Sequence, residues 1–238
     1  IADLKNLIVN RVRPSTLVYI AFDGVPPRAK MVQQRARRHK GKILEDFKER
    51  MCQQFECEDT YTWSSVKISP GTKFMKKMAD MMRSKIEAGY FCWKENNNLS
   101  IILSDTSVPG EGEHKFMPTI RQLSTDENTK IAIFSPDADL IVLSIASRKS
   151  NIYIGRSPNN STEILKELYA NRDFFYLNMD AVKRSTLTFL SDDLNEDNLT
   201  MEDLYALMHD YSFLTFLSGN DFVLPLPYLK VKHNKKGM

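Results

Sequence analysis

The sequence predicts an α/β fold, with a mostly parallel central sheet flanked by helices and a helical C-terminal part. Short apolar runs rich in β-branched residues alternate with longer amphipathic stretches, which is the pattern of strands and helices in this fold class. The runs are almost continuously hydrophobic, as expected of parallel strands covered on both faces. The composition agrees, because 238 residues with 42% hydrophobic and 26% charged side chains are typical of one large globular domain or at most two small ones.

The predicted elements alternate along the chain, which begins inside a helical stretch. Four apolar runs are expected to be strands: residues 17–22, 100–103, 130–134 and 151–154. Four amphipathic stretches are expected to be helices: about 27–55, 72–88, 112–123 and 138–147. Pro118 is expected to kink the third of these helices or to end its first turn.

Beyond about residue 158 the pattern becomes helical. Thr200 and Asp203 have the spacing of a capping box, and the apolar stripe 204–217 follows them. Residues 96–98 and 191–199 are expected to be polar loops.

The charge distribution is uneven, although the net charge is only +3. Between Arg28 and Lys42 there are seven basic residues and no acidic one, and the rest of the chain has 26 basic and 30 acidic residues. A concentrated basic segment on a mildly acidic body indicates an anionic partner. Three cysteines without a Cys-x-x-Cys pair predict neither a disulfide framework nor a thiolate zinc site, and they favour a reducing compartment. No run is apolar and long enough to predict a membrane span or a signal peptide.

Acidic residues follow several of the apolar runs. Ligands of open α/β sheets bind at the carboxyl ends of strands, so acids at these positions are the first candidates for a site. The candidates are Asp23, Glu111, Glu113, Asp137, Asp139 and Asp221. Each of them alone could be a helix cap, as Asp139 could be for 140–147, and Asp105 is expected to be a turn residue. Together, like charges at one sheet edge favour neutralisation by Mg²⁺ or Mn²⁺, which prefer oxygen ligands.

Two divalent ions held by such acids would suit phosphodiester cleavage, because they stabilise the attacking and the leaving oxygen. A general-base histidine is then not needed, and His114 is expected to be solvated or hydrogen-bonded rather than catalytic. The sequence contains no Walker loop, GxGxxG motif or Ser-His-Asp arrangement.

One face of the predicted basic helix could bind a phosphate. Lys30, Gln34, Arg37 and Arg38 are spaced at i, i+4, i+7 and i+8, which places them on one side of a helix. Two guanidiniums, an ammonium and an amide supply the donors that a terminal phosphate needs. A solvated charged face is the alternative, but the acids that would pair with these cations along the helix are absent. The pattern favours a phosphate-terminated polyanion as the ligand of this helix face.

Five ordered motifs resemble the XRN family of 5′→3′ exoribonucleases, which is related to the flap-endonuclease and PIN-like nucleases. The motifs are AFDGVPPRAKMVQQRARR (21–38), ISPGTKFM (68–75), SDTSVPGEGEHKFM (104–117), SPDADLIVL (135–143) and FLSGNDF (216–222). The resemblance implies a PIN/FEN-like core in which the six acids bind two Mg²⁺ or Mn²⁺ ions. It implies that Lys30, Gln34, Arg37 and Arg38 bind a 5′-monophosphate, and that the substrate is single-stranded RNA, degraded to 5′-mononucleotides in RNA decay or processing.

The sequence departs from the family pattern in a few places. The family has a further metal-binding Asp on its first strand, expected upstream of Ile1, and a second conserved region, expected beyond Met238. Residues 1–238 are therefore expected to be a single nuclease-domain fragment that is incomplete at both ends. The family's NDFLPHLP is NDFVLPLP here, starting at Asn220.

Two other functions stay open. The chain could be a 5′-phosphate RNA-binding module without catalysis, or a flap-type, structure-selective DNA nuclease. A phosphatase of the haloacid-dehalogenase kind is disfavoured, because Asp23-Gly-Val lacks the DxD spacing of its nucleophile. The expected location is cytoplasmic, with the nucleus or a viral protein in host cytoplasm as alternatives, and no protein partner is predicted.

Overall fold

The computed structural model of the chain describes residues 1–55, 65–93, 98–124, 128–158, 163–169, 171–191 and 200–229. The chain forms two compact units, Ile1–Phe116 and Met117–Met238, which are described separately below. The boundary between them falls inside helix α4 (Gly112–Gln122). The predicted polar loops at 96–98 and 191–199 lie largely outside the described residues.

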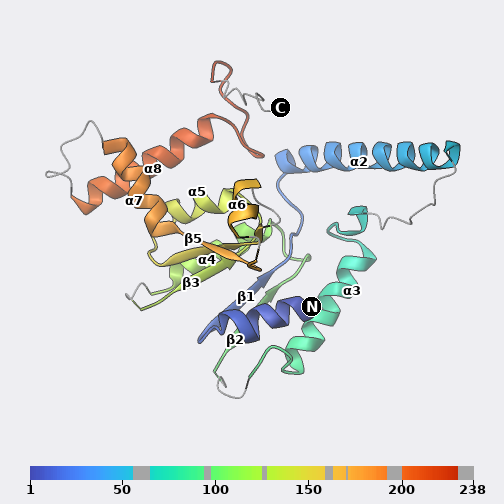
Figure 1. Cartoon of the computed structure of the whole chain (residues 1–238), viewed down its shortest axis with the longest axis horizontal. Coiled ribbons are helices and arrows are strands. Elements are labelled where there is room, and N and C mark those ends of the chain that lie inside the picture. The colour runs from blue at the N-terminus through green and yellow to red at the C-terminus, as the bar shows by residue number, and fades with distance from the viewer. Residues whose placement is uncertain are drawn as a thin grey trace. The chain divides into compact units, whose positions relative to one another are not determined.

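The first unit is built around two parallel strands. A short helix, α1 (Ala2–Lys5), and a π-helical segment, η1 (Asn6–Val12), precede β1 (Leu17–Ala21). Strand β1 pairs in parallel with β2 (Ser100–Ser104), so that Leu17 lies opposite Ser100 and Ala21 opposite Ser104 (Figure 1). The core under this pair contains Ile8, Ile20, Met82 and Phe91. The carboxyl ends of β1 and β2 therefore lie side by side.

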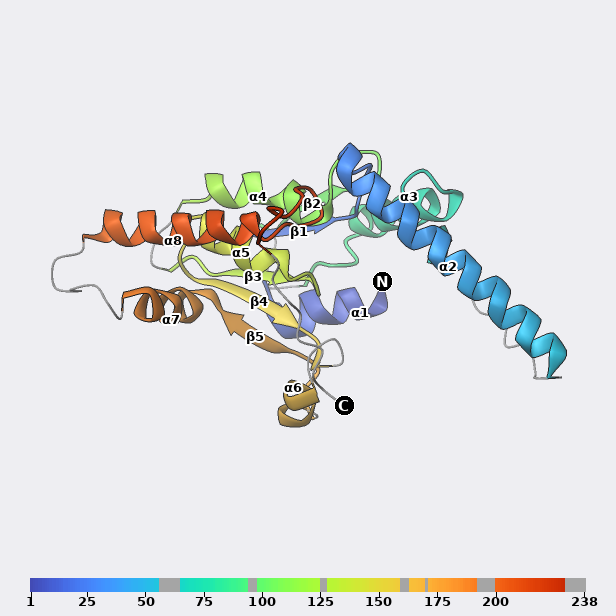
Figure 2. The same ribbon diagram turned by 90° about the horizontal axis from the view of Figure 1, so that it is seen from above.

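Helix α2 (Arg28–Gln54) follows β1 and is the longest element of the chain that the structure describes. Its buried residues are Lys30 and Gln34, both in its first two turns. Figures 1 and 2 both show the C-terminal part of the helix extending away from β1 and β2. A short 3₁₀ segment, η2 (Ser65–Lys67), and α3 (Lys73–Glu87) lead on to β2.

The second unit contains a three-stranded mixed sheet. Strands β3 (Ile131–Phe134) and β4 (Ile152–Arg156) pair in parallel, and β5 (Phe175–Asn178) pairs antiparallel with β4. Its helices are α5 (Asp139–Ala146), α6 (Glu163–Leu168), α7 (Met179–Ser191) and α8 (Met201–Leu217). Helices α5, α7 and α8 pack on one another. Apolar side chains from both the strands and the helices are buried, among them Ile133, Ile152, Ile154, Leu140, Ile145, Met179 and Met208.

The structure confirms the α/β class and most of the predicted elements. The four predicted strands and four predicted helices all form, with ends shifted by one or two residues, and the Thr200 and Asp203 capping box is present. The strands of the described residues form two separate sheets, of two and three strands, and one strand pair is antiparallel. The helical prediction beyond residue 158 is wrong for β5. Of the two alternatives predicted for Pro118, a kink or an end of the first turn, the second is wrong, because α4 continues through Pro118 to Gln122.

None of the helices that the structure describes has the combination of length and apolar sequence needed to cross a bilayer.

Candidate functional site

The segments that follow β1 and β2 are joined by backbone hydrogen bonds. The Phe22 N–H donates to the Ser104 carbonyl at 2.9 Å, and the Gly24 N–H donates to the Gly110 carbonyl at 2.8 Å. The two segments approach so closely at Gly24 that a Cβ there would overlap the Val108 carbonyl oxygen. The pairing therefore continues past the strand ends and carries Asp23 to the start of α4.

Asp23 caps helix α4. Its Oδ1 accepts a hydrogen bond from the Gly112 N–H at 2.7 Å, and Gly112 is the first residue of that helix. The carboxylate thus satisfies a backbone donor that the helix itself cannot pair. This is the helix-cap alternative that the sequence left open, and Asp23 is otherwise exposed to solvent.

Glu111 and Glu113 are both buried, at the beginning of α4. A carboxylate oxygen of each and a ring nitrogen of His114 lie within 4.8 Å of one another. His114 is exposed, whereas the two glutamates are covered. The group offers oxygen and imidazole ligands to a cation, with Glu113 in the first turn of α4 and Glu111 directly before that helix.

Lys30 pairs with Glu111. The Lys30 Nζ lies 3.2 Å from Glu111 Oε1, and the side chains are only 10% and 5% exposed. The other oxygen of the same carboxylate, Oε2, is buried and has no hydrogen-bond partner among the described residues. A buried carboxylate oxygen without a donor is unfavourable unless a cation or a proton neutralises it. The residues present therefore fit a metal ion at Glu111.

Lys115 is a residue that the sequence analysis missed. Its Nζ donates to the Phe22 carbonyl at 2.7 Å and to the Asp105 carbonyl at 2.8 Å, so that one ammonium binds the ends of both β1 and β2. Burial lowers the pKa of this lysine, and the charges of Asp105 and Asp23 oppose that shift. Its place two residues after Glu113, in the motif EGEHK, was the available signal.

Asp105 is a turn residue, as predicted. Its Oδ1 accepts hydrogen bonds from the Ser107 N–H, at 2.8 Å, and from the Ser107 hydroxyl. Its Oδ2 pairs with Arg83 of α3. The hydrogen bonds from Ser107 and the nearby Arg83 charge lower the pKa of the Asp105 carboxyl. This acid is therefore occupied by structural contacts.

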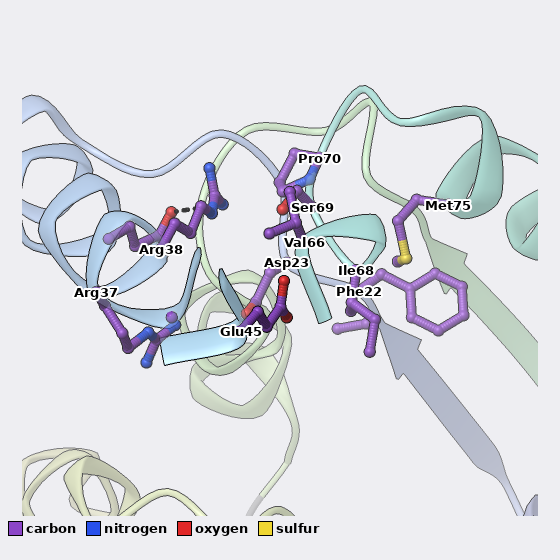
Figure 3. Close-up of a pocket in the computed structure, with 13 residues that line it drawn as sticks. Phe22, Asp23, Arg37, Arg38, Glu45, Val66, Ile68, Ser69, Pro70 and Met75 are labelled. Carbon is purple, nitrogen blue, oxygen red and sulfur yellow. Dashed lines mark hydrogen bonds between the residues drawn. The ribbon is translucent and has the colours of Figure 1, made fainter. Parts of the chain in front are cut away.

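A cavity of about 630 Å³ lies between α2 and the segment 66–70 (Figure 3). Its walls include Gln34, Arg37 and Arg38 of α2 together with Asp23. The Arg38 guanidinium donates from Nη2 to Gln34 Oε1 at 3.3 Å. Three of the four predicted phosphate-binding residues thus face one cavity that also contains a predicted metal ligand. The fourth, Lys30, contacts Glu111.

The remaining predicted metal ligands lie in the second unit. Asp137 Oδ1 accepts a hydrogen bond from the Asp139 N–H at 3.0 Å, and Asp139 is the first residue of α5. The Asp137 carbonyl accepts from Arg156 Nη2 at 2.7 Å. Asp221 is half-buried after α8, in a turn where Asn220 Oδ1 accepts from the Phe222 and Val223 N–H groups. Asp139 is thus the first residue of α5 rather than its N-cap, which is Ala138.

Comparison with known proteins places this chain in a family. Residues 1–158, about two thirds of the sequence, match the family described as XRN 5′-3′ exonuclease N-terminus. The chain belongs to the XRN family. The match covers the first unit and the part of the second unit that ends with β4.

Similar proteins include three named 5′-3′ exoribonuclease 2 or its homologue. The proteins from Kluyveromyces lactis and Saccharomyces cerevisiae are 34% and 33% identical to this XRN chain over 98% of its length. The homologue from Caenorhabditis elegans is 32% identical over 94% of the chain. The aligned region is 27%, 26% and 28% of these proteins, respectively, so the chain spans about a quarter of their length.

Proposed function

We propose that this protein hydrolyses single-stranded RNA from a 5′-monophosphate end, in the 5′→3′ direction and with divalent metal ions, releasing 5′-mononucleotides. The observation that carries the proposal is the cavity in which Arg37, Arg38 and Gln34 face Asp23. Cationic donors for a terminal phosphate and an acid suited to a metal lie in the same space. The names of the relatives, 5′-3′ exoribonuclease 2, agree with this chemistry.

The basic face of α2 is proposed to hold the 5′ end of the RNA. Arg37 and Arg38 can each donate to phosphate oxygens in bidentate fashion, and Gln34 adds an amide. The Arg38–Gln34 hydrogen bond orients one guanidinium before the substrate binds. A 5′-hydroxyl end lacks the charge that these groups recognise, and a triphosphate or cap is larger than the single phosphate they would enclose.

The acids at the strand ends are proposed to hold the metal ions. Glu111, with its unpartnered buried oxygen, and the neighbouring Glu113 and Asp23 are the proposed ligands in the first unit. Asp137, Asp139 and Asp221 of the second unit are proposed as ligands on the family resemblance. When bound, Mg²⁺ or Mn²⁺ supplies Lewis-acid stabilisation of the charge that develops during phosphodiester cleavage.

Lys30 and Lys115 are proposed to keep this acid-rich end of the sheet assembled. Lys30 balances Glu111 through its ion pair, and Lys115 binds the backbone carbonyls that end the two strands. Both cations reduce the mutual repulsion of the carboxylates.

Two further parts of the proposal concern the fold. We propose that the strands of both units belong to a PIN/FEN-like nuclease core, and that residues 1–238 are part of a single nuclease domain. Both rest on the family membership and on the α/β elements of each unit.

The proposal is tested with the purified chain and three uniformly labelled versions of one RNA, carrying a 5′-monophosphate, a 5′-hydroxyl or a 5′-triphosphate. We expect mononucleotide release from the monophosphate RNA only, in Mg²⁺ or Mn²⁺, and none in EDTA. Asp23→Asn is expected to abolish release, whereas Asp46→Asn, on the exposed part of α2, is expected to leave it unchanged.

Two results would separate the alternatives. Preferential binding of the monophosphate RNA without release would support the RNA-binding module instead. Cleavage of a DNA flap in preference to all three RNAs would support the flap-type nuclease, and the absence of both binding preference and cleavage would contradict the proposal.

A further inference from the structure

Ser69 is a buried polar residue for which the fold provides no internal partner. It is 7% exposed, and its hydroxyl oxygen has no hydrogen-bond partner among the residues that the structure describes. It lines the same cavity as Arg37 and Arg38, from the opposite wall (Figure 3). Buried hydroxyls in folded proteins are nearly always hydrogen-bonded, so this one requires an explanation.

The backbone around Ser69 is held in a tight turn. The Thr72 N–H donates to the Ser69 carbonyl at 3.2 Å, and the Thr72 hydroxyl donates to it as well, at 2.9 Å. Pro70 and Gly71 occupy the two central positions, and Gly71 has φ of +84°, which the second central position of a type II turn requires. Thr72 then caps α3 through the Met75 N–H at 3.3 Å.

These contacts give Pro70, Gly71 and Thr72 of the motif ISPGTKFM a structural role, but the Ser69 side chain takes no part in them. The turn fixes the Ser69 backbone through its carbonyl, and Ser69 is one of the residues that line the cavity. The fold thus presents a hydroxyl on a rigid turn, across from two guanidiniums. A hydroxyl held in this way can donate to a bound anion with little further loss of freedom.

The rest of the cavity indicates what the hydroxyl would bind. The charged residues of the lining are Asp23, Glu45, Arg37 and Arg38, and the two guanidiniums are the groups that would attract an anion. A cavity of about 630 Å³ is large enough for a phosphate with the nucleotide that carries it. Phosphate oxygens accept hydrogen bonds from hydroxyls as readily as from guanidiniums.

We propose that the Ser69 hydroxyl is a further recognition group for the phosphorylated 5′ end of the RNA, donating a hydrogen bond to it from the wall opposite Arg37 and Arg38. This inference rests on the proposed function of the cavity and adds the segment 68–72 to it. The phosphate is then bound from two sides, by α2 and by the turn that begins α3.

The test is the affinity of the 238-residue chain for a short RNA with a 5′-phosphate and for the same RNA with a 5′-hydroxyl, measured in EDTA so that no cleavage occurs. We expect Ser69→Ala to weaken binding of the phosphorylated RNA about tenfold, as loss of one hydrogen bond to a charged group predicts. Binding of the hydroxyl RNA should change less than twofold. Ser69→Thr, which keeps the hydroxyl, should restore the preference, and Ser84→Ala, at an exposed site on α3, is the matched control.

The outcomes distinguish this inference from the proposed function. If Arg38→Ala abolishes the preference for phosphorylated RNA and Ser69→Ala does not change it, the role of Ser69 is wrong and the phosphate pocket stands. If the unaltered chain shows no preference for the 5′-phosphate, the proposed function and the role of Ser69 both fail. If Ser69→Ala weakens both RNAs equally, the hydroxyl does not recognise the 5′ end, and the inference is overturned.

Discussion

The two halves of helix α2 carry similar charged residues in different environments. In the first half, Lys30 and Gln34 are buried and Lys30 pairs with the buried Glu111. In the second half, Lys42 pairs with Asp46 at 2.8 Å, four residues further along the same helix, and the side chains are 59% and 47% exposed. The ion pair in the first half joins two elements at a candidate site, whereas the pair in the second half lies in solvent. A run of basic residues therefore has two distinct roles, and burial decides between them.

The largest expected effect is the loss of the Lys30 charge. Lys30→Met leaves the Glu111 carboxylate buried without its cation, which should lower the free energy of unfolding by about 3–5 kcal/mol. Urea unfolding at pH 7 without divalent ions measures this change. The double variant Lys30→Met/Glu111→Gln should recover more than half of the loss, because no unpaired charge is then left inside. A Lys30→Met variant as stable as the parent would show that the pair contributes nothing.

The next effect concerns binding rather than stability. Arg38→Ala removes a guanidinium from the cavity and should weaken binding of 5′-phosphorylated RNA about 10- to 100-fold. Arg50→Ala is the matched control, since Arg50 lies on the exposed second half of the same helix. Fluorescence anisotropy with labelled RNA measures both. Equal losses for the two variants would mean that the two halves of α2 attract RNA in the same non-specific way.

A smaller effect is expected at Asp105, an acid at the same strand ends whose contacts are structural. Its pKa is lowered in the folded state by Ser107 and Arg83, so the charged form stabilises the fold. That contribution is present above the unfolded-state pKa of about 3.9 and is lost as the pH falls through the lowered folded-state pKa. The stability advantage of the parent chain over Asp105→Asn should therefore be larger at pH 7 than at pH 3. Unfolding curves at the two pH values measure this difference in stability. The same difference between parent and variant at both pH values would contradict the prediction.

The smallest effect is expected in the second half of α2. Asp46 raises the pKa of Lys42, but both groups are in solvent, where such pairs contribute little and are screened by salt. Lys42→Met should leave the melting temperature unchanged within error, in 0.1 M and in 1 M NaCl alike. A clear loss of stability at low salt would remove the contrast between the two halves.

Much of the fold follows from local sequence patterns. The runs at 17–22 and 151–154 are apolar and β-branched, and amphipathic stretches separate them, so that strands and helices were predictable with their approximate ends. Strand β5 was missed because it is a short antiparallel edge strand inside a segment of helical texture, and its side chains are only partly buried. The separation of the strands into two sheets depends on long-range packing, which no local pattern encodes.

The candidate site was predictable in its residue types but not in its contacts. The i, i+4 spacing places Lys30 and Gln34 on one face of α2, and both are buried. The pairing of Lys30 with Glu111, 81 positions later in the chain, required the tertiary structure. Lys115 and Ser69 were missed for the same reason, since a lysine or a serine in a motif has no pattern that reveals which backbone or cavity it faces.

The most direct test of the proposed metal and phosphate site is a crystal structure of the chain grown with MnCl₂ and a 5′-phosphorylated dinucleotide, with anomalous diffraction data for manganese. We predict a manganese peak in contact with the buried Glu111 carboxylate, and phosphate density between Arg38 and Ser69. Phosphate density outside the cavity, with Glu111 bound only to Lys30 and no manganese beside it, would contradict this prediction.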